Sequence, residues 1–154
     1  MALQTQPPMM DTSPAMTPIA AFRPCPGSAP KRIAIVDDEP VIRSLLERLL
    51  KIAGYETASY PNGETALAAC QREAFDLVIT DLRMPGIDGF ELMENLKSQR
   101  PSLPVIVLTA HGDVDNAIRA LRRRACDFIT KPFDTCNILN SIRRVIERSS
   151  RADN

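Results

Sequence analysis

The sequence predicts an α/β domain in which a five-stranded parallel sheet is covered by helices on both faces. Two hydrophobic patterns alternate from Lys31 onward: short runs rich in β-branched residues, and longer stretches in which apolar residues recur at helical spacing. This strand–helix order repeats five times, and such alternation requires parallel strands joined by crossover helices. The run Val105–Leu108 is apolar throughout, as expected of a central strand buried on both sides.

The five strands are predicted from the short apolar runs, and a helix follows each of them. The strand runs are 32–36, 55–60, 75–80, 103–109 and 126–130, and the helical spacing covers 42–53, 64–72, 90–96, 114–121 and 138–146. Gly54 is expected to end the first helix in the left-handed conformation. Cys126 lies in the last strand run, so we expect its thiol to be buried as a small hydrophobic group.

The first 30 residues differ in composition from the rest of the chain. They hold seven of the 13 prolines, two charged residues (Asp11 and Arg23) and no hydrophobic periodicity. We predict that 1–30 is a disordered or partly polyproline II tail, which serves either as a docking segment or as a plain spacer. The predicted domain spans 31–149, and 150–154 is a short C-terminal tail.

Composition excludes several classes of function. Lys plus Arg and Asp plus Glu both number 19, so zero net charge argues against a whole-chain electrostatic grip on nucleic acid or an anionic membrane. No apolar stretch approaches the roughly 18 residues of a membrane span. The four cysteines lack metal-binding spacing and His111 is the only histidine, so we expect no zinc site and a reduced, cytoplasmic protein.

Reactive side chains gather where the predicted strands end. Asp37 and Asp38 follow the first strand, Asp81 the third, Thr109 ends the fourth, and Lys131 follows the fifth. Ligands of open α/β sheets bind at this edge. Clustered carboxylates need a cation, and hard oxygen donors in an open loop suit Mg²⁺.

The remaining groups at this edge suit a phosphoryl ligand. Lys131 and Thr109 can hold phosphoryl oxygens, and one of the carboxylates can accept the phosphoryl group covalently. The glycine-rich motifs of dinucleotide and P-loop sites are absent from the sequence.

Each of these residues also has an ordinary structural interpretation when it is taken alone. Asp38 can cap the helix that opens at Pro40, and Asp81 can begin a turn. Thr109 can be a plain strand residue and Lys131 a solvated surface lysine. The placement of all of them at the ends of four different strands favours a shared site.

Four segments carry a family resemblance: Ile35–Pro40, Asp81–Gly89, Leu108–His111 and Lys131–Phe133. In order and spacing, 31 to about 149 resembles the receiver domain of two-component response regulators, and most of all the receivers of the nitrogen-regulation and nitrogen-fixation type. The resemblance implies a flavodoxin-like fold with strand order 2-1-3-4-5.

The resemblance also implies roles for the acidic residues. Asp81 matches the phosphoacceptor, which takes its phosphoryl group from a phosphohistidine. Asp38 matches a direct Mg²⁺ ligand, Asp37 acts mainly through water, and Asp81 and the backbone carbonyl of Arg83 complete the metal site.

Other matched positions would respond to the phosphoryl group. Lys131 would pair with a phosphoryl oxygen, while Thr109 and Phe128 match the switch hydroxyl and the switch aromatic. Arg83 and His111 lie two residues past Asp81 and Thr109, where they would set the lifetime of the acyl phosphate. The Lys131–Pro132 bond is expected to be cis, as in the family.

Arg124 departs from the family pattern. Related receivers usually carry glycine here, at the end of the fourth helix, and a non-glycine residue in the left-handed conformation costs about 1 kcal/mol. We expect either a strained Arg124 or a helix that ends differently. The three arginines at 122–124 are either a solvated basic face or a docking patch for an acidic partner.

The family implies a signalling protein that catalyses only its own phosphorylation and dephosphorylation. The expected partners are a sensor histidine kinase or a histidine phosphotransfer protein, and a downstream protein on the face of the fourth helix, fifth strand and fifth helix. A phosphorylation-dependent dimer is possible, and neither nucleic acid nor a membrane is expected to bind directly.

Asn154 closely follows the last predicted helix, which favours a single-domain regulator. The alternatives are a receiver fragment of a longer DNA-binding transcription regulator, and a phosphate sink or relay intermediate.

Overall fold

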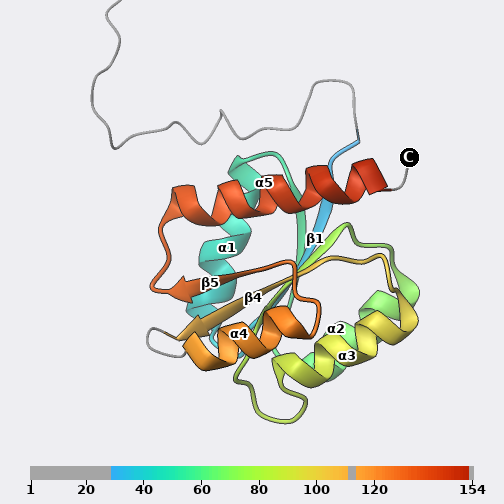
Figure 1. Cartoon of the computed structure of the whole chain (residues 1–154). Helices are drawn as coiled ribbons and strands as arrows, with labels where there is room; N and C mark the ends of the chain where they lie inside the picture. Colours follow the sequence, from blue (N-terminus) through green and yellow to red (C-terminus); the bar gives the residue numbers. More distant parts are fainter. Residues whose placement is uncertain (1–28, 111–113, 153–154) are drawn as a thin grey trace, which may run out of the picture.

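The computed structural model describes residues 29–110 and 114–152, and there the predicted alternation of strands and helices is confirmed (Figure 1). The elements are β1 (Arg32–Val36), α1 (Pro40–Ile52), β2 (Glu56–Tyr60), α2 (Gly63–Arg72), β3 (Leu77–Asp81), α3 (Gly89–Gln99), β4 (Val105–Ala110), α4 (Val114–Arg122), β5 (Asp127–Lys131) and α5 (Thr135–Ala152).

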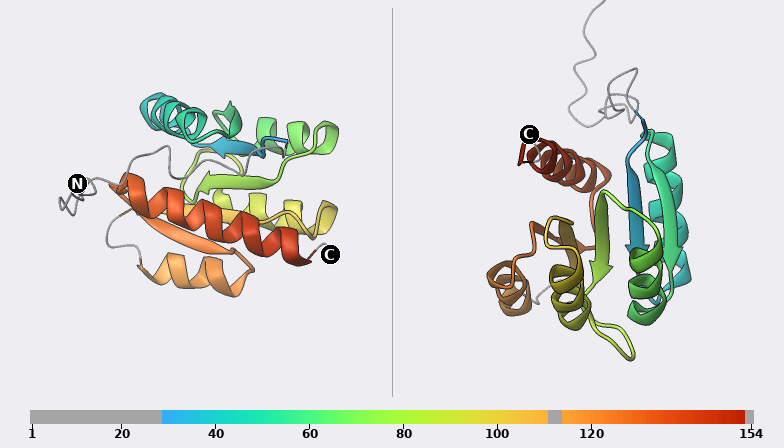
Figure 2. Two further views of the ribbon diagram at one scale, coloured as in Figure 1. Left: turned by 90° about the horizontal axis from the view of Figure 1, so that it is seen from above. Right: turned by 90° about the vertical axis from the view of Figure 1, so that its right-hand side faces the viewer.

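The five strands form one parallel sheet in the order β2-β1-β3-β4-β5, as the resemblance implied. The order changes direction beside β1, so β1 and β3 lie at the centre and their carboxyl ends face the same edge. In an open sheet, this is where a ligand site forms. Figure 2 shows the sheet between two layers of helices.

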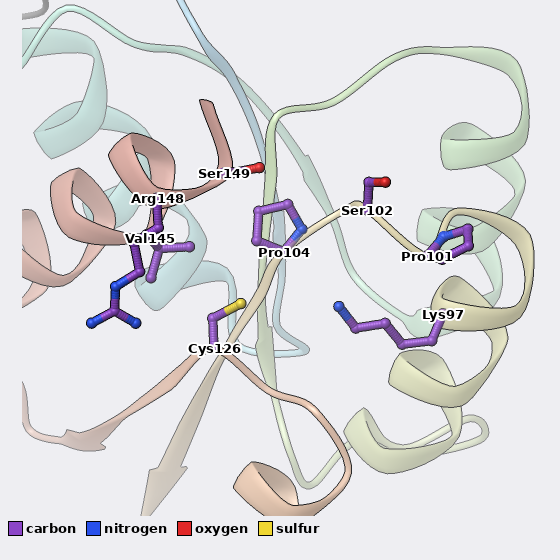
Figure 3. Close-up of a pocket in the computed structure, with 8 residues that line it drawn as sticks. All are labelled: Lys97, Pro101, Ser102, Pro104, Cys126, Val145, Arg148 and Ser149. Atoms are coloured by element: carbon purple, nitrogen blue, oxygen red, sulfur yellow. The ribbon is translucent and has the colours of Figure 1, made fainter. Parts of the chain in front are cut away.

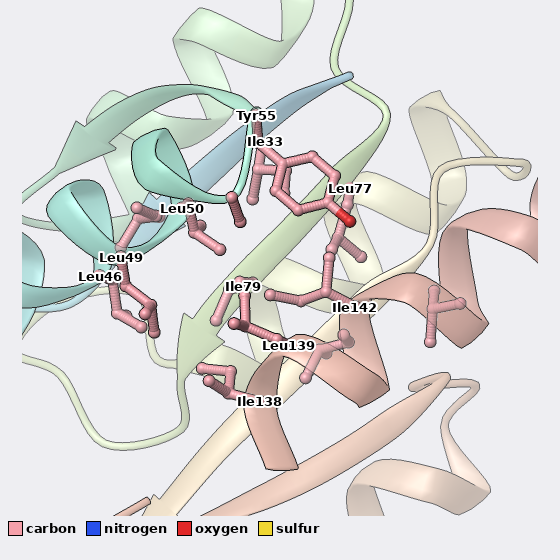
Figure 4. Close-up of a cluster of buried hydrophobic side chains, with 14 of the residues drawn as sticks. Ile33, Leu46, Leu49, Leu50, Tyr55, Leu77, Ile79, Ile138, Leu139 and Ile142 are labelled. Atoms are coloured by element: carbon pink, nitrogen blue, oxygen red, sulfur yellow. The ribbon is translucent and has the colours of Figure 1, made fainter. Parts of the chain in front are cut away.

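One face of the sheet packs against α1 and α5. Its core consists of large aliphatic side chains, including Ile33 and Ile35 of β1, Leu46 of α1 and Ile142 of α5, all fully buried (Figure 4). Full burial of such a side chain stabilises the fold by about 1.5–3 kcal/mol.

The other face packs against α2, α3 and α4. Alternate residues of the same strands point to this side, including Ala34, Val78 and Val107, and they meet Leu92 and Leu96 of α3. Because both faces are buried, the central strands are apolar up to their carboxyl ends, and the period-two pattern of a one-sided sheet is absent.

The loop from β3 to α3 is folded tightly against the end of β3. A Cβ atom on Gly89 would lie 2.5 Å from the carbonyl oxygen of Asp81, so only glycine fits at this point. The Gly89 N–H donates to the carbonyl of Leu82 (3.0 Å), and the Asp88 carboxylate caps α3 by accepting from the Glu91 N–H (2.9 Å). These contacts hold the loop that follows Asp81.

The expectation for Gly54 is confirmed, and for Arg124 the structure decides between the two alternatives. Gly54, after α1, has φ 97°, and Arg124, after α4, has φ 78°. Arg124 therefore adopts the strained left-handed conformation, the first of the two alternatives.

Two features differ from the sequence predictions. Cys126 is exposed rather than buried: its N–H donates to the Val105 carbonyl (2.8 Å), but it precedes the first register pair of β4 and β5, Ile106 with Asp127, at the open amino edge of the sheet. The helix α5 continues to Ala152, so the predicted C-terminal tail at 150–154 begins inside it; Ser149 to Ala152 lack apolar periodicity but do not interrupt a helix. Most of the predicted N-terminal tail lies outside the described residues.

None of the helices in the described ranges combines the length and the apolar character that crossing a membrane would require.

Candidate functional site

The register of the sheet brings the predicted site residues together at its carboxyl edge. Val36 of β1 pairs with Thr80 of β3, so Asp37 and Asp81 follow at adjacent positions of neighbouring strands. On the other side, Ala110 of β4 pairs with Lys131 of β5. Residues that are far apart in the sequence thus meet because parallel strands end at the same level.

Four carboxylates form one cluster at this edge. Asp37, Asp38, Glu39 and Asp81 each place one oxygen so that the four oxygens lie within 4.8 Å of one another. Asp37 and Asp81 are buried, whereas Asp38 and Glu39 are exposed. The cluster therefore has a buried floor and a side open to solvent, and its donors are the hard oxygens that Mg²⁺ prefers.

Lys131 supplies the positive charge that the cluster needs. Its Nζ lies 2.9 Å from Asp37 Oδ2 and 3.0 Å from Asp81 Oδ2, and it lies 3.5 Å from Glu39 Oε1. The Lys131 side chain is only 16% exposed. The following Lys131–Pro132 peptide bond is cis, as expected.

Burial and pairing shift the protonation equilibria in this cluster. Burial raises the pKa of Asp37, although the Glu39 N–H and Lys131 act in the opposite direction. For Lys131, burial alone would lower the pKa, but its hydrogen bonds to Asp37 and Asp81 outweigh that effect and raise the pKa above its usual value. Lys131 therefore stays an ammonium, which suits it to hold an anionic group at Asp81.

Backbone contacts fix the two buried carboxylates. Asp37 Oδ1 accepts from the Glu39 N–H (2.9 Å), and Asp81 Oδ1 accepts from the Arg83 N–H (3.3 Å). Arg43 Nη1 donates to the Asp37 carbonyl (2.7 Å), which ties α1 to the end of β1. Each buried carboxylate thus has one oxygen held by a backbone N–H and the other by Lys131.

Thr109 and Phe128 lie on the same face of the sheet. In the pairing of β4 with β5, Thr109 lies opposite Thr130. Two residues earlier on both strands, Val107 lies opposite Phe128. Val107 belongs to the core on the α4 side, and side chains two residues apart share a face, so Thr109 and Phe128 both point toward that side. Thr109 is buried and Phe128 is partly buried.

The start of α3 is linked to α4 and to the residue after it through cation–π contacts. Phe90, at the start of α3, lies beneath two guanidinium groups, with Arg119 at 4.9 Å and Arg123 at 5.3 Å from the ring centroid. Arg123 also forms an ion pair with Glu94 (2.8 Å). These contacts fix the start of α3 against α4.

Some predicted site residues are not placed by this geometry. His111 lies outside the described residues. Arg83 is beside Asp81 through its N–H, while the predicted role of its carbonyl stays a prediction. Glu39 joins the cluster although sequence reasoning treated it only as part of a helix start. Its position as the third acidic residue of the run Asp37–Glu39 was the available signal.

Comparison with known proteins identifies the family. Residues 33–143 match the response regulator receiver domain. The chain is 39% identical over 132 residues to the C4-dicarboxylate transport transcriptional regulatory protein DctD of Pseudomonas aeruginosa, covering 86% of this chain and 28% of that protein. It is 41% identical over 112 residues to the DNA-binding transcriptional regulator NtrC of Salmonella typhimurium, covering 73% of this chain and 24% of that protein. The chain thus spans about a quarter of the length of these relatives.

Solved structures agree in fold. The receiver domain of NtrX from Brucella abortus has a TM-score of 0.73 at 38% identity, covering 75% of this chain and 98% of that chain. The structure titled FixJ-N has a TM-score of 0.73 at 37% identity, covering 78% of this chain and 96% of that chain. These matches confirm the resemblance to response regulator receivers, including those of NtrC and NtrX. With its sheet order, its acidic edge and its sequence all in agreement, the chain belongs to the receiver-domain family of two-component response regulators.

Proposed function

We propose that Asp81 accepts a phosphoryl group from the phosphohistidine of a sensor kinase or of a histidine phosphotransfer protein, and that this reaction switches a protein-binding face. The observation that carries the proposal is the Asp81 carboxylate, buried beside the Lys131 ammonium at 3.0 Å and within a cluster of four carboxylates. Ordinary surface carboxylates are neither buried nor held in this way.

The transfer forms one bond and breaks another. A carboxylate oxygen of Asp81 attacks phosphorus, an O–P bond forms, and the N–P bond to the donor imidazole breaks; the imidazole leaves and takes up a proton. Lys131 pairs with a phosphoryl oxygen as negative charge builds up near Asp81. In this proposal the protein catalyses only its own phosphorylation and the later hydrolysis.

The acidic cluster suits Mg²⁺, which receiver domains generally bind in an acidic pocket. Asp38 and Asp81 would hold the ion directly, the Arg83 carbonyl would join them, and Asp37 would act mainly through water. When bound, the ion offsets the repulsion between carboxylates and phosphoryl oxygens. The exposed carboxylates of Asp38 and Glu39 keep one side of the cluster accessible.

The response is proposed to pass through Thr109 and Phe128 to the face formed by α4, β5 and α5. A phosphoryl group on Asp81 would draw the Thr109 hydroxyl toward it, and Phe128, on the same face of the sheet, would move into the vacated space. Ile118 and Leu121 of α4 are exposed (42% and 40%), and such apolar side chains suit a protein partner. The partner, and any phosphorylation-dependent dimer, would bind there.

The phosphodonor is proposed to dock on α1. This helix begins directly after the acidic cluster, and its residues Val41 and Leu45 are 76% and 47% exposed. Apolar side chains beside the reacting carboxylate would position a donor protein. Ile52 is also exposed (49%) but lies at the far end of α1, which makes it a matched control.

The first test is chemical phosphorylation of the full chain with acetyl phosphate. Mass spectrometry should show one phosphoryl group in the presence of Mg²⁺ and none in Asp81→Asn. The control Asp115→Asn removes an exposed carboxylate of α4 and should be labelled like the wild type. Full labelling of Asp81→Asn at another residue would refute the site.

The second test separates the donor surface from the chemistry. Val41→Ser and Leu45→Ser should slow transfer from a phosphorylated histidine phosphotransfer protein and leave labelling by acetyl phosphate unchanged. Ile52→Ser should alter neither reaction. Equal rates from the protein donor in all three variants would exclude docking on α1.

The relatives support a second candidate for the output. The name of NtrC describes a DNA-binding transcriptional regulator, and the chain matches only 24% of that protein. In this alternative the receiver controls a DNA-binding domain of a longer chain, and the genomic reading frame decides between the two.

A phosphate sink or relay would be recognised by return of the phosphoryl group from Asp81 to a phosphotransfer protein. All these roles place the protein in the cytoplasm.

A further inference from the structure

A cavity opens at the amino edge of the sheet, opposite the acidic cluster. It has a volume of about 360 Å³ and is lined by the end of α3, the connection before β4, the residue before β5 and the last turns of α5 (Figure 3). Small-molecule sites begin at about 300 Å³. The cavity shares no residue with the cluster around Asp81.

The charged groups of this cavity are cationic. Lys97 and Arg148 line it, together with the hydroxyls of Ser102 and Ser149, and no carboxylate is among its lining residues. Within 29–110 and 114–152, neither Lys97 nor Arg148 forms an ion pair, unlike Lys131. Anions are therefore the charged ligands that these walls can accept.

The Lys97 ammonium is fixed by one hydrogen bond and keeps donors for a ligand. Its Nζ donates to the carbonyl of Leu103 (3.0 Å), and the remaining N–H donors of the ammonium have no partner among the described residues. Burial lowers the pKa of Lys97; the nearby Cys126 acts in the opposite direction, and Arg124 lowers the pKa further. A cation that has lost hydration without gaining a counter-charge is stabilised by an arriving anion.

The rest of the cavity wall is apolar. Pro101 and Pro104 lie on the side of the β4 connection and Val145 on the side of α5, and the Cys126 thiol lies between them (Figure 3). Rigid proline rings and a buried valine suit a flat hydrocarbon body. Small-ligand sites combine such walls with few polar groups that fix orientation.

We propose that this cavity binds a small organic anion with an aromatic body and a carboxylate or sulfonate group, the acidic group lying near Lys97 and Arg148 and the ring between Pro101, Pro104 and Val145. The site is separate from the proposed phosphoacceptor and needs no phosphorylation.

The first experiment titrates the full chain with anilinonaphthalene sulfonate and follows its fluorescence. Binding should saturate, and Lys97→Gln or Arg148→Gln should each weaken it about three- to fivefold, as expected for one partly exposed charge pair. The control Arg151→Gln removes a cation of α5 that does not line the cavity and should leave binding unchanged. N-phenylnaphthylamine has the same rings without the sulfonate and should bind more weakly, with equal affinity for all variants.

The second experiment uses Cys126 as a reporter in a Cys25→Ser, Cys136→Ser background, where Cys70 is buried. Dithiobis-nitrobenzoate is an anionic aromatic disulfide, and dithiodipyridine is a neutral one. Lys97→Gln should slow the anionic reagent relative to the neutral reagent, and this ratio cancels any change in the thiol itself. Saturating anilinonaphthalene sulfonate should protect Cys126 from both reagents.

The proposal is overturned if the dye fluorescence does not saturate. It is also overturned if the dye affinity, and the ratio of the Cys126 reaction rates with the two disulfides, are the same in the cavity variants and in Arg151→Gln. If Lys97→Gln fails to fold, Arg148→Gln decides, because Arg148 is exposed and forms no hydrogen bond or ion pair within the described residues. Circular dichroism of each variant shows that dye binding does not arise from partial unfolding.

Discussion

Asp37 and Lys131 form an ion pair across the carboxyl edge of the sheet, with Lys131 Nζ 2.9 Å from Asp37 Oδ2, although 94 residues separate them in the chain. The same ammonium reaches Asp81. This pair places one positive charge among four carboxylates, and the balance between them determines both the stability of the edge and its chemistry.

Lys131→Ala should keep the fold and still accept a phosphoryl group on Asp81, but it should lose the conformational response. The phosphoryl oxygens would no longer be held toward β5, where Lys131 and Phe128 lie. Amide chemical shifts of α4, β5 and α5, recorded with and without beryllofluoride, measure the response. The exposed Lys51→Ala serves as control, and a wild-type response in Lys131→Ala would contradict the proposed role.

Asp37→Asn should be more stable than the wild type near neutral pH in the absence of Mg²⁺. Burial raises the pKa of Asp37 in the folded protein above that in the unfolded chain. The stability that the protonated carboxyl contributes is therefore fully present below the unfolded pKa and is lost as the pH rises through the folded pKa. The advantage of Asp37→Asn should therefore shrink as the solution is acidified through that range. Urea unfolding with a chelator present measures it, and a constant difference at every pH would exclude this cause.

Asp38→Asn and Glu39→Gln should raise the Mg²⁺ concentration needed for labelling by acetyl phosphate to different extents. Asp38→Asn removes a proposed direct ligand and should raise the required Mg²⁺ concentration about tenfold or more. Glu39→Gln removes only an exposed neighbouring charge and should raise it only a few-fold. The half-saturating Mg²⁺ concentration is the measurement. A larger effect of Glu39→Gln would make Glu39, which the sequence did not single out, the ligand.

Arg124→Gly should stabilise the protein. Arg124 has φ 78°, and removing its Cβ strain should raise the free energy of unfolding by about 0.5–1 kcal/mol. Arg122→Gly, two residues earlier and still in α4, should instead destabilise by about 0.5–1 kcal/mol. Urea denaturation of both variants tests the contrast, and destabilisation by Arg124→Gly would show that the arginine side chain contributes more than its backbone strain costs.

Phe90 and Arg119 should be energetically coupled. Arg119 lies 4.9 Å from the centroid of the Phe90 ring, and a cation–π contact at such a site contributes about 0.5–1 kcal/mol. A double-mutant cycle with Phe90→Leu and Arg119→Gln isolates this energy. Additive effects would mean that the contact does not link α3 to α4.

Several features could be read from the chain order alone. The alternating periodicities determined the number and the kind of the elements, since a buried strand and an amphipathic helix need different spacings of apolar residues. The left-handed backbone of Arg124 was one of two alternatives that the family resemblance left open, and this conformation commonly ends a helix. The grouping of Asp37, Asp81, Thr109 and Lys131 followed from one rule, that parallel strands end at the same edge.

Other features depend on where pairing begins and on which side chains meet. Cys126 belongs to an apolar run and its N–H donates to Val105 of β4, but its side chain is exposed because it lies at the open amino edge of the sheet. Glu39 enters the acidic cluster because the start of α1 lies beside Lys131 of the last strand, a contact across most of the chain.

The sequence by itself determined that this protein is a receiver with its carboxylates at one edge of a parallel sheet. Only the tertiary structure decided that Lys131 bonds to Asp37 and Asp81 together, and that Lys97 and Arg148 line an apolar cavity at the opposite edge. Periodicity records which side of an element is buried, but distances between side chains of different elements depend on how the helices pack on the sheet.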